Sequence, residues 1–250
     1  MSFMALFKFE LKKFFKQKPA LTGIIIVILS TIFFCILNIV NRPVGTYSGI
    51  DMVMDSLHIQ NNILFIFPMV TILLTVYSLT GEISTRTLTT VLTKPVKREN
   101  IISCKFLSIF LYTCLIFYTM LVISLLFGLR WGYGEGSASF FFRILFIYFI
   151  YVLGTLVLVA FTFIVTSVVN NLFIVALISL GFHRLWLIIE TFSQIRNYTF
   201  SYHVTSSFQL LMAQSINFGL IRESLVVILV YMLAFLLIAA TLWERKDIQT

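Results

Sequence analysis

Long apolar runs separated by short polar segments dominate the pattern of this chain. Six such runs lie near residues 21–40, 63–80, 106–127, 142–165, 172–189 and 225–242. A helix needs about 20 mainly apolar residues to cross a hydrocarbon core about 30 Å thick, because it rises about 1.5 Å per residue. The runs do not show the strict alternation that is typical of outer-membrane barrel strands. The pattern predicts an all-α integral membrane protein with six transmembrane helices, forming a single transmembrane domain of residues 1–250.

Composition supports this prediction. Of the 250 residues, 60% are hydrophobic and 11% are charged, and the mean hydropathy is +1.02. A soluble domain is roughly half apolar and a quarter charged. The three cysteines fall in or beside the apolar runs, so a framework of extracellular disulfides is not expected.

Between the fourth and fifth runs, only Asn170 and Asn171 interrupt the hydrophobic sequence. A single long tilted helix through both runs would place these two amides at mid-membrane, where unpaired amides are costly. The pair therefore favours a tight helical hairpin over one long helix.

Lysine and arginine gather on one side of the expected membrane. Twelve of them stand before the first run, between the second and third runs, and after the sixth, whereas six stand in the other connections. Cytoplasmic loops of membrane proteins are enriched in these residues, so both termini are expected in the cytosol. Because topology accounts for the basic charge, we do not infer nucleic-acid binding from it.

Residues 1–19 combine apolar residues at helical spacing with a basic stripe at Lys8, Lys12 and Lys16. This pattern predicts an amphipathic helix in the cytosolic membrane interface. The alternative is a positively charged topology signal with little structure. The residues expected to form the working surface of this interfacial helix are Phe3, Phe7, Glu10, Leu11, Lys12 and Phe14.

Two longer connections lie on the other side of the membrane. Residues 41–62 are expected to form a solvated loop, and residues 190–224 an extracellular interfacial segment with aromatic residues at headgroup depth. Within the second run, Pro68 removes a backbone donor and is expected to kink the helix.

The polar, net basic segment of residues 81–105 lies in the cytosol in this topology. Leu88, Val91 and Leu92 recur there at helical spacing, and Pro95 disfavours helix at the residue before it. A short amphipathic helix is expected, which suits a groove in a partner protein.

These residues resemble the ABC type-2 transporter permeases. The resemblance rests on Glu82 after the second run, on Thr87-Leu88 and Val91-Leu92 in a T-L-x-x-L-L-x-x-P-like run, and on the sequence P-x-x-R followed by a lysine. The tail with Trp243, Arg245, Lys246 and Asp247 also looks like the usual ending of this family. One departure is Arg86, which stands where many members have glycine.

The resemblance implies a dimer of permeases in a bacterial cytoplasmic membrane, formed with a second copy or a paralogue. Two separate ATPase subunits would bind ATP and Mg, so this chain is expected to be a non-catalytic subunit without a cofactor or metal of its own. The sequence has no phosphate-binding loop of the G-x-x-x-x-G-K-[ST] type, which agrees with this. The cytosolic helix between the second and third runs would then be the coupling helix. Its expected coupling residues are Glu82, Arg86, Thr87, Leu88, Val91, Leu92, Pro95, Arg98 and Lys105.

The central parts of the six runs carry no Asp, Glu, Lys, Arg or His, which disfavours ion-coupled transport. Hydroxyl side chains remain as candidates for lining a translocation path. They are Thr71, Thr75, Ser78 and Ser179. Local bonding of these hydroxyls to carbonyls of the preceding turn is the alternative.

An aromatic and aliphatic lining favours export of a hydrophobic or amphipathic substrate, and we expect a peptide. A drug, a lipid-like molecule or sodium are alternative cargoes within the same family. Outside transport, two hypotheses stay open. One is a membrane-embedded enzyme using His183, Glu190 and His203, and the other is a non-transporting immunity or scaffold protein.

Overall fold

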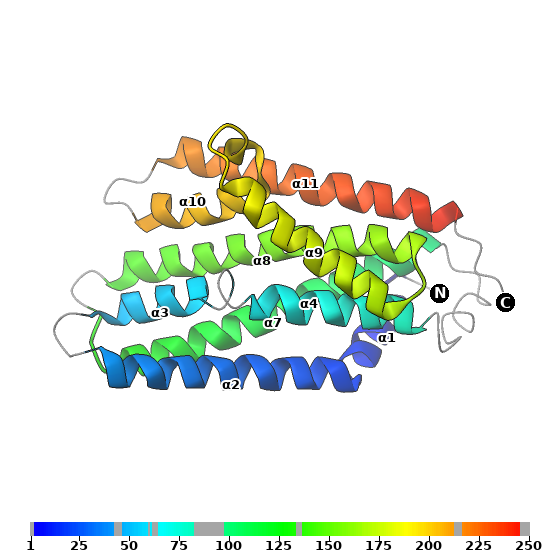
Figure 1. The fold of residues 1–250 in the computed structure, drawn as a ribbon. Helices are drawn as coiled ribbons and strands as arrows, with labels where there is room; N and C mark the ends of the chain where they lie inside the picture. The colour runs from blue at the N-terminus through cyan, green and yellow to red at the C-terminus, as the bar shows by residue number, and fades with distance from the viewer. Residues whose placement is uncertain are drawn as a thin grey trace.

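The chain forms an elongated bundle of helices (Figure 1), shown by a computed structural model that describes residues 3–42, 47–59, 61, 65–82, 98–133, 137–212 and 217–245. Within these ranges no strand occurs, so the all-α prediction is confirmed for them. The helices are α1 (Phe3–Phe15), α2 (Lys18–Asn41), α3 (Gly49–His58), α4 (Ile66–Val76), η2 (Tyr77–Gly81), α7 (Arg98–Gly128), α8 (Ser137–Val168), α9 (Leu172–Glu190), η3 (Arg196–Tyr198), α10 (Phe200–Met212) and α11 (Phe218–Arg245).

The two ends of the bundle are named here by the helices found there. α1 and the last turn of α11 lie together at one end, called the α1 end (Figure 1). The first turns of α3 and α8 lie at the opposite end, called the α3 end. Both described chain ends therefore share one end of the molecule.

Five helices are long and apolar enough to cross a membrane, judged by length and composition. They are Lys18–Asn41, Asn100–Gly128, Phe140–Val168, Leu172–Glu190 and Phe218–Arg245. The second expected run, residues 63–80, forms only the shorter apolar helix Ile66–Gly81. It starts late because Phe65 has a φ of +44°, a left-handed conformation that cannot belong to a right-handed helix. Six full-length spans are thus not found among the described residues.

The expectation of a solvated loop at residues 41–62 is wrong where the structure describes it, because much of that stretch is the packed helix α3. A capping box starts this helix: the Asp51 N–H donates to Ser48 Oγ at 3.1 Å and the Ser48 N–H donates to Asp51 Oδ2 at 3.0 Å. Met52, Val53 and Leu57 are fully buried. Asp51, which is exposed, thus stabilises the start of a helix whose other face is buried.

Two glycines let α3 approach α7 closely at the α3 end. The Gly49 N–H donates to the carbonyl oxygen of Gly132 at 2.8 Å. A Cβ on Gly49 would lie 2.7 Å from the Gly128 carbonyl oxygen, and one on Gly128 would lie 3.0 Å from that of Gly49. Any larger residue at either position would push the two helices apart.

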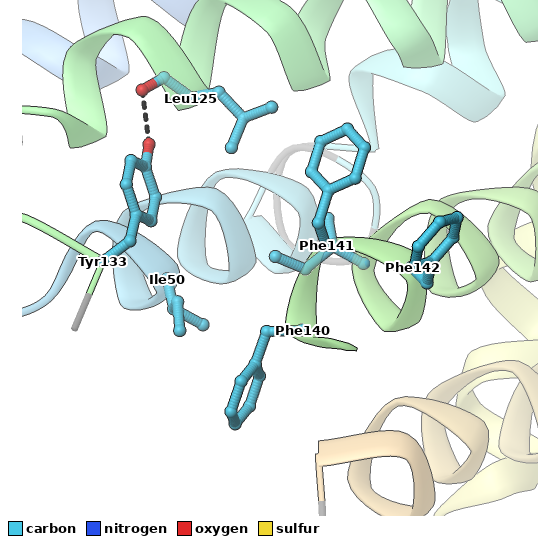
Figure 2. A pocket seen from close by; sticks show the side chains of 7 residues that line it. Ile50, Leu125, Tyr133, Phe140, Phe141 and Phe142 are labelled. Atoms are coloured by element: carbon cyan, nitrogen blue, oxygen red, sulfur yellow. Dashed lines mark hydrogen bonds between the residues drawn. The ribbon is translucent and has the colours of Figure 1, made fainter. Parts of the chain in front are cut away.

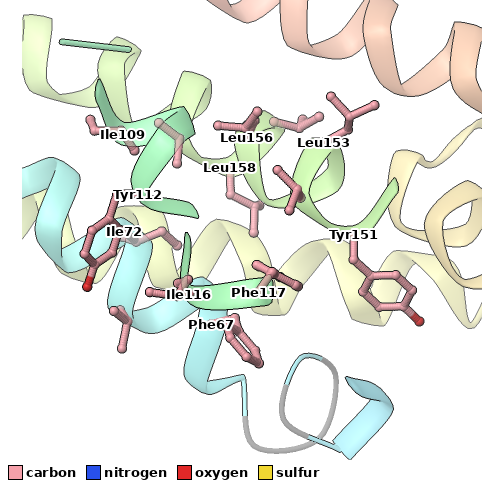
Figure 3. Packing of buried hydrophobic residues seen from close by; sticks show 14 of the residues in the cluster. Phe67, Ile72, Ile109, Tyr112, Ile116, Phe117, Tyr151, Leu153, Leu156 and Leu158 are labelled. Atoms are coloured by element: carbon pink, nitrogen blue, oxygen red, sulfur yellow. The ribbon is translucent and has the colours of Figure 1, made fainter. Parts of the chain in front are cut away.

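The apolar core is built around α8. In its apolar window 78% of the residues are buried, against 11% in α11, so α8 is the central helix and α11 a peripheral one. Figure 3 shows core side chains of α4, α7 and α8 packed together. Phe67 stacks on Phe117 with ring centroids 4.3 Å apart, which joins α4 to α7.

The helical hairpin expected at Asn170 and Asn171 is present. α8 ends at Val168 and α9 begins at Leu172. The Asn171 side chain accepts hydrogen bonds from the backbone N–H groups of Phe173 at 3.0 Å and Ile174 at 3.2 Å. The amide that would have been costly at mid-membrane is therefore the cap of α9.

Pro68 does not kink a helix, contrary to the expectation from sequence. It stands in the first turn of α4, where a missing N–H costs no hydrogen bond. The irregular part of this helix is its other end, where Tyr77–Gly81 forms the π-helix η2.

Residues 190–224 contain more regular structure than an interfacial segment requires. η3 and α10 lie within this range, and α11 already begins at Phe218. α10 packs against α8 and α11, and its buried residues include Phe200, Val204 and Leu211. This segment thus folds back along the bundle.

Candidate functional site: a buried charge cluster

Lys105 in α7 is the centre of a group of charged side chains at the α1 end. Its side chain is 2% exposed, yet the ammonium group has three acceptors. It donates to Glu82 Oε2 at 2.8 Å, to Glu10 Oε2 at 3.0 Å and to the Ser78 carbonyl oxygen at 3.4 Å. Three acceptors match the three protons of an ammonium group, so the buried charge is compensated.

Glu10 reaches Lys105 because α1 docks on α7 through one stripe of residues. Leu6, Glu10 and Phe14 are the buried residues of α1, and they recur every fourth position on one face. Leu6 packs with Ile101 and Cys104 of α7. Farther along, the Phe14 ring meets Tyr112 edge-to-face, and the apolar contacts at both ends of the stripe bury the carboxylate between them.

Glu82 follows directly after η2 and lies between two cations. One carboxylate oxygen binds Lys105, and the other, Oε1, is 3.0 Å from Lys13 Nζ. The Lys13 side chain is 26% exposed, whereas that of Glu82 is 6% exposed. Lys13 therefore covers the outer side of the group. We call Glu10, Lys13, Glu82 and Lys105 the charge cluster.

The charge cluster is electrically balanced, with two carboxylates and two ammonium groups. Burying an unpaired ion costs several kcal/mol even after relaxation, so removing one partner of a buried pair destabilises by about 3–5 kcal/mol. Because its members come from α1, from the residue directly after η2 and from α7, the cluster holds three segments of the chain in one arrangement.

The structure brings together three residues that the sequence singled out in separate segments, namely Glu10, Glu82 and Lys105. Arg98 is the first residue of α7, which makes α7 begin well before residue 106. Six further coupling residues lie in the range 83–97, outside the described residues. They are Arg86, Thr87, Leu88, Val91, Leu92 and Pro95.

On the interfacial helix, the expected working surface is only partly the buried one. Phe14 is buried, but Phe3 is 44% exposed and Lys12 is exposed. Phe7 and Leu11 are half-buried. Leu6, which the sequence did not single out, thus joins Glu10 and Phe14 on the face of α1 that packs on α7.

Sequence reasoning did not assign Lys13 to the site, because it was counted only as a topology charge. A signal for the cluster was present in the sequence. Glu10 is the one acid on a stripe whose other members, Leu6 and Phe14, are apolar. An acid flanked at four-residue spacing by apolar residues is expected to be buried with a partner.

The candidate path residues are buried in the bundle. The Thr71 hydroxyl donates to the Phe67 carbonyl at 2.8 Å, and the Thr75 hydroxyl donates to the Thr71 carbonyl at 2.7 Å. Ser78 contributes its carbonyl oxygen to Lys105, while Ser179 is 1% exposed. The two threonines thus make the local bonds that the alternative interpretation describes.

An apolar pocket of about 360 Å³ lies at the α3 end (Figure 2). Three consecutive phenylalanines from the start of α8 contribute to it. The lining residues are Ile50, Leu125, Tyr133, Phe140, Phe141, Phe142 and Ile144. The Tyr133 hydroxyl is already engaged, since it donates to the Leu125 carbonyl. None of these described lining residues carries a charge, so the surface they form suits an apolar ligand.

The residues of the enzyme hypothesis do not converge. His183 and His203 line two different cavities. His203 lies between Ser224 Oγ at 3.1 Å from Nδ1 and the Asn197 carbonyl oxygen at 2.8 Å from Nε2. The described residues therefore do not assemble His183 and His203 into one acid-base centre.

Comparison with known proteins shows that a family model matches this chain. Residues 6–184 match the family model described as ABC-2 family transporter protein. No curated protein matches the chain. The matched range contains Glu10, Lys13, Glu82 and Lys105, the complete charge cluster, and it ends before α10 and α11.

Proposed function

Since this chain belongs to the ABC-2 family of transporter proteins, we propose that it is the transmembrane permease subunit of an ABC exporter powered by a separate ATPase. Within that complex, the charge cluster would pass the motion of the ATPase to the membrane helices. The observation that carries the proposal is the burial of Lys105 between Glu10 and Glu82.

The position of Glu82 gives the cluster this role. Glu82 stands immediately before residues 83–97, where the sequence predicts the coupling helix. A force on that segment reaches Glu82 first, and the ion pairs carry it to α1 and α7 together. Conformational change passes efficiently between elements that are firmly packed or paired.

We propose that the α1 end lies in the cytosol, because α1 carries basic residues of the N-terminus at that end. α3 and α4 would then make the second crossing together, since α4 with η2 is short for a span. Six crossings with both termini in the cytosol result. The membrane is the bacterial cytoplasmic membrane in this proposal.

The partners in the proposal are two ATPase subunits, which bind ATP and Mg, and a second copy or a paralogue of this chain. Three helices have large apolar surfaces for lipid or for that second permease. The buried share of the apolar window is 28% in α2, 22% in α9 and 11% in α11. Surfaces of this kind are stable only in lipid or against another chain.

The cargo we favour is a hydrophobic or amphipathic peptide leaving the cytoplasm. The apolar pocket at the α3 end supports an apolar cargo, because the described residues that line it are aromatic or aliphatic (Figure 2). A drug or a lipid-like molecule would fit the same chemistry. Sodium would not, because its ligands are oxygen atoms.

Transport by inside-out vesicles tests the proposal. Vesicles with the chain and its copurified ATPase should take up a fluorescent amphipathic peptide only with ATP. Leu88→Asp with Leu92→Asp should abolish this uptake, because both leucines lie on the expected coupling face. Thr90→Asp, on the opposite face, is the matched control and should retain it.

Peptide uptake that is equal with and without ATP would contradict export and favour a sequestering immunity protein. Full ATP-dependent uptake in the double leucine variant would contradict the assignment of the coupling face. Failure of any ATPase to copurify with the chain would contradict the permease assignment itself.

A further inference from the structure

α4 starts inside the bundle, after the segment that separates it from α3, which we call the break. α3 ends at His58 and α4 begins at Ile66. Phe65, the residue before α4, has a φ of +44°, which is costly for an aromatic residue. Strained backbone of this kind is found mostly where the surrounding structure requires it, often at ligand sites.

A cavity of about 30 Å³ lies beside this break, and we call it the break cavity. Pro68 brings the first turn of α4 to it, and α8, α9 and α10 supply the other walls. Its polar lining residues are Asn61, Tyr151, Thr155, His183, Ser201 and Thr205. A concentration of polar side chains inside a membrane bundle requires an explanation.

Two polar atoms at this cavity lack a partner among the described residues. His183 Nε2 and Ser201 Oγ are both buried and make no hydrogen bond within that part of the chain. The His183 residue as a whole is 6% exposed. A buried polar group that is left unsatisfied destabilises the fold. The fold tolerates them together most readily when a small polar molecule fills the space between them.

Tyr151 lines the break cavity on the side of the apolar core. It belongs to α8 and is 1% exposed. Figure 3 shows its ring at the edge of the apolar cluster, with the hydroxyl pointing away from the other labelled side chains. Tyr151 is thus a core residue whose polar group lies outside the apolar packing, at the break cavity.

Size and hydrogen-bonding character select the ligand. The Thr155 hydroxyl donates to the Tyr151 carbonyl at 2.9 Å and the Thr205 hydroxyl donates to the Ser201 carbonyl at 3.0 Å, so both offer only acceptor lone pairs to the cavity. The Ser201 hydroxyl is able to donate. A ligand that both donates and accepts is therefore required.

A cation is disfavoured by its surroundings. The Arg184 guanidinium lies 3.6 Å from the centroid of the Phe65 ring, directly at the break. The first turn of α4 at the cavity is also the positive end of that helix. An anion is disfavoured in turn by the acceptor lone pairs of the threonines.

We propose that the break cavity is a binding site for about two water molecules, since each water needs about 10–15 Å³ of such space. The waters hydrogen-bond His183 Nε2 and Ser201 Oγ and join α9 to α10 at the break before α4. Water in this place satisfies polar groups that the helices cannot satisfy with one another.

Radiolytic footprinting of the full chain in lipid nanodiscs tests this site. Radicals formed from bound water label nearby side chains, even those that bulk water does not reach. We expect Tyr151 and His183 to be labelled in the unchanged protein, although both are buried. Ser201→Val places an apolar methyl group in the cavity and should lower this labelling by about fivefold or more as water loses its partner. Ser206→Val, on α10 but outside the cavity lining, should leave the labelling unchanged.

Unlabelled Tyr151 and His183 in the unchanged protein would overturn the proposal, and so would equal labelling in Ser201→Val. If that variant does not fold, high-resolution cryo-EM of the unchanged chain decides. Density peaks at hydrogen-bond distance from both His183 Nε2 and Ser201 Oγ support water. An empty cavity, a metal ion or a lipid tail in it contradicts the proposal.

Discussion

The charge cluster and the break cavity lie at opposite ends of the same short helical segment, α4 with η2. At the α1 end, Glu82 is tied directly to Lys105 and Lys13. At the break, His183 Nε2 and Ser201 Oγ have no partner among the described residues. One end of the segment is therefore held by ion pairs between helices, and the other by the water that we propose.

The two ends differ in what it costs to disturb them. An ion left unpaired in the bundle costs about 3–5 kcal/mol, because its charge cannot return to water. A neutral hydroxyl bound to water costs far less to remove, since the water remains with its other partners. The difference teaches that polar groups at comparable depth of burial can have opposite roles, one fixing an arrangement and the other allowing it to change.

Removing the central cation should have the largest effect. Lys105→Met leaves Glu10 and Glu82 buried without their shared partner, and we expect the chain to lose about 3–5 kcal/mol of stability. Thermal unfolding of the purified chain in detergent measures the loss. Lys12→Met, at an exposed position on α1, is the control and should change little. A similar stability of both variants would refute the structural role of the cluster.

Neutralising the two carboxylates separately ranks the members of the cluster. Glu82→Gln weakens contacts to two cations, whereas Glu10→Gln weakens a contact to one. We expect losses of about 3 kcal/mol for the first variant and about half of that for the second. The same unfolding measurement checks the order. The reverse order would mean that Glu10 rather than Glu82 is the main anion of Lys105.

The outer cation should matter least within the cluster. Lys13→Met removes a partly exposed ion pair, which contributes about 0–1 kcal/mol. The effect should shrink further at high salt, because exposed pairs are screened. Unfolding at low and at high salt tests this. A loss as large as that of Lys105→Met, unchanged by salt, would show that Lys13 is buried in the working protein.

At the other end of α4, losing a hydroxyl should have the smallest effect. Ser201→Ala removes one hydrogen bond to the proposed water and should change stability by about 0.5 kcal/mol or less, because the remaining water keeps His183 satisfied. Unfolding alongside Ser206→Ala checks this. A loss above about 2 kcal/mol would indicate a direct bond to protein at Ser201 and would remove the contrast between the two ends.

The long helices could be predicted from sequence because continuous apolarity has few physical solutions in a membrane. The same holds for the hairpin at Asn170 and Asn171, where an amide at mid-membrane would be costly. α3 was missed because its acidic residues made it look solvated, although Ser48 and Asp51 stand at the spacing of a capping box in the sequence. The late start of α4 depends on one φ angle at Phe65, and no local sequence pattern predicts that angle.

The site could be predicted only in part for a different reason. Glu82 and Lys105 were singled out through their resemblance to a family, but the contact of Lys105 with Glu10 spans a long stretch of sequence. Pairing of charges across such a distance is decided by how α1 docks on α7. Docking depends on Leu6, which was not singled out from the sequence because weight was given to the aromatic residues of α1. Tertiary packing, not local pattern, selects the partner.

The charge cluster also constrains the order in which the helices of the protein can dock during synthesis. Glu10 and Lys105 are 95 residues apart, so the carboxylate of α1 emerges from the ribosome long before its partner exists. Until then its favourable environment is water, because burial without a cation is costly. α1 can dock in its final place only after the start of α7 has been made. The first helix of the chain therefore reaches its native contacts later than its place in the sequence suggests.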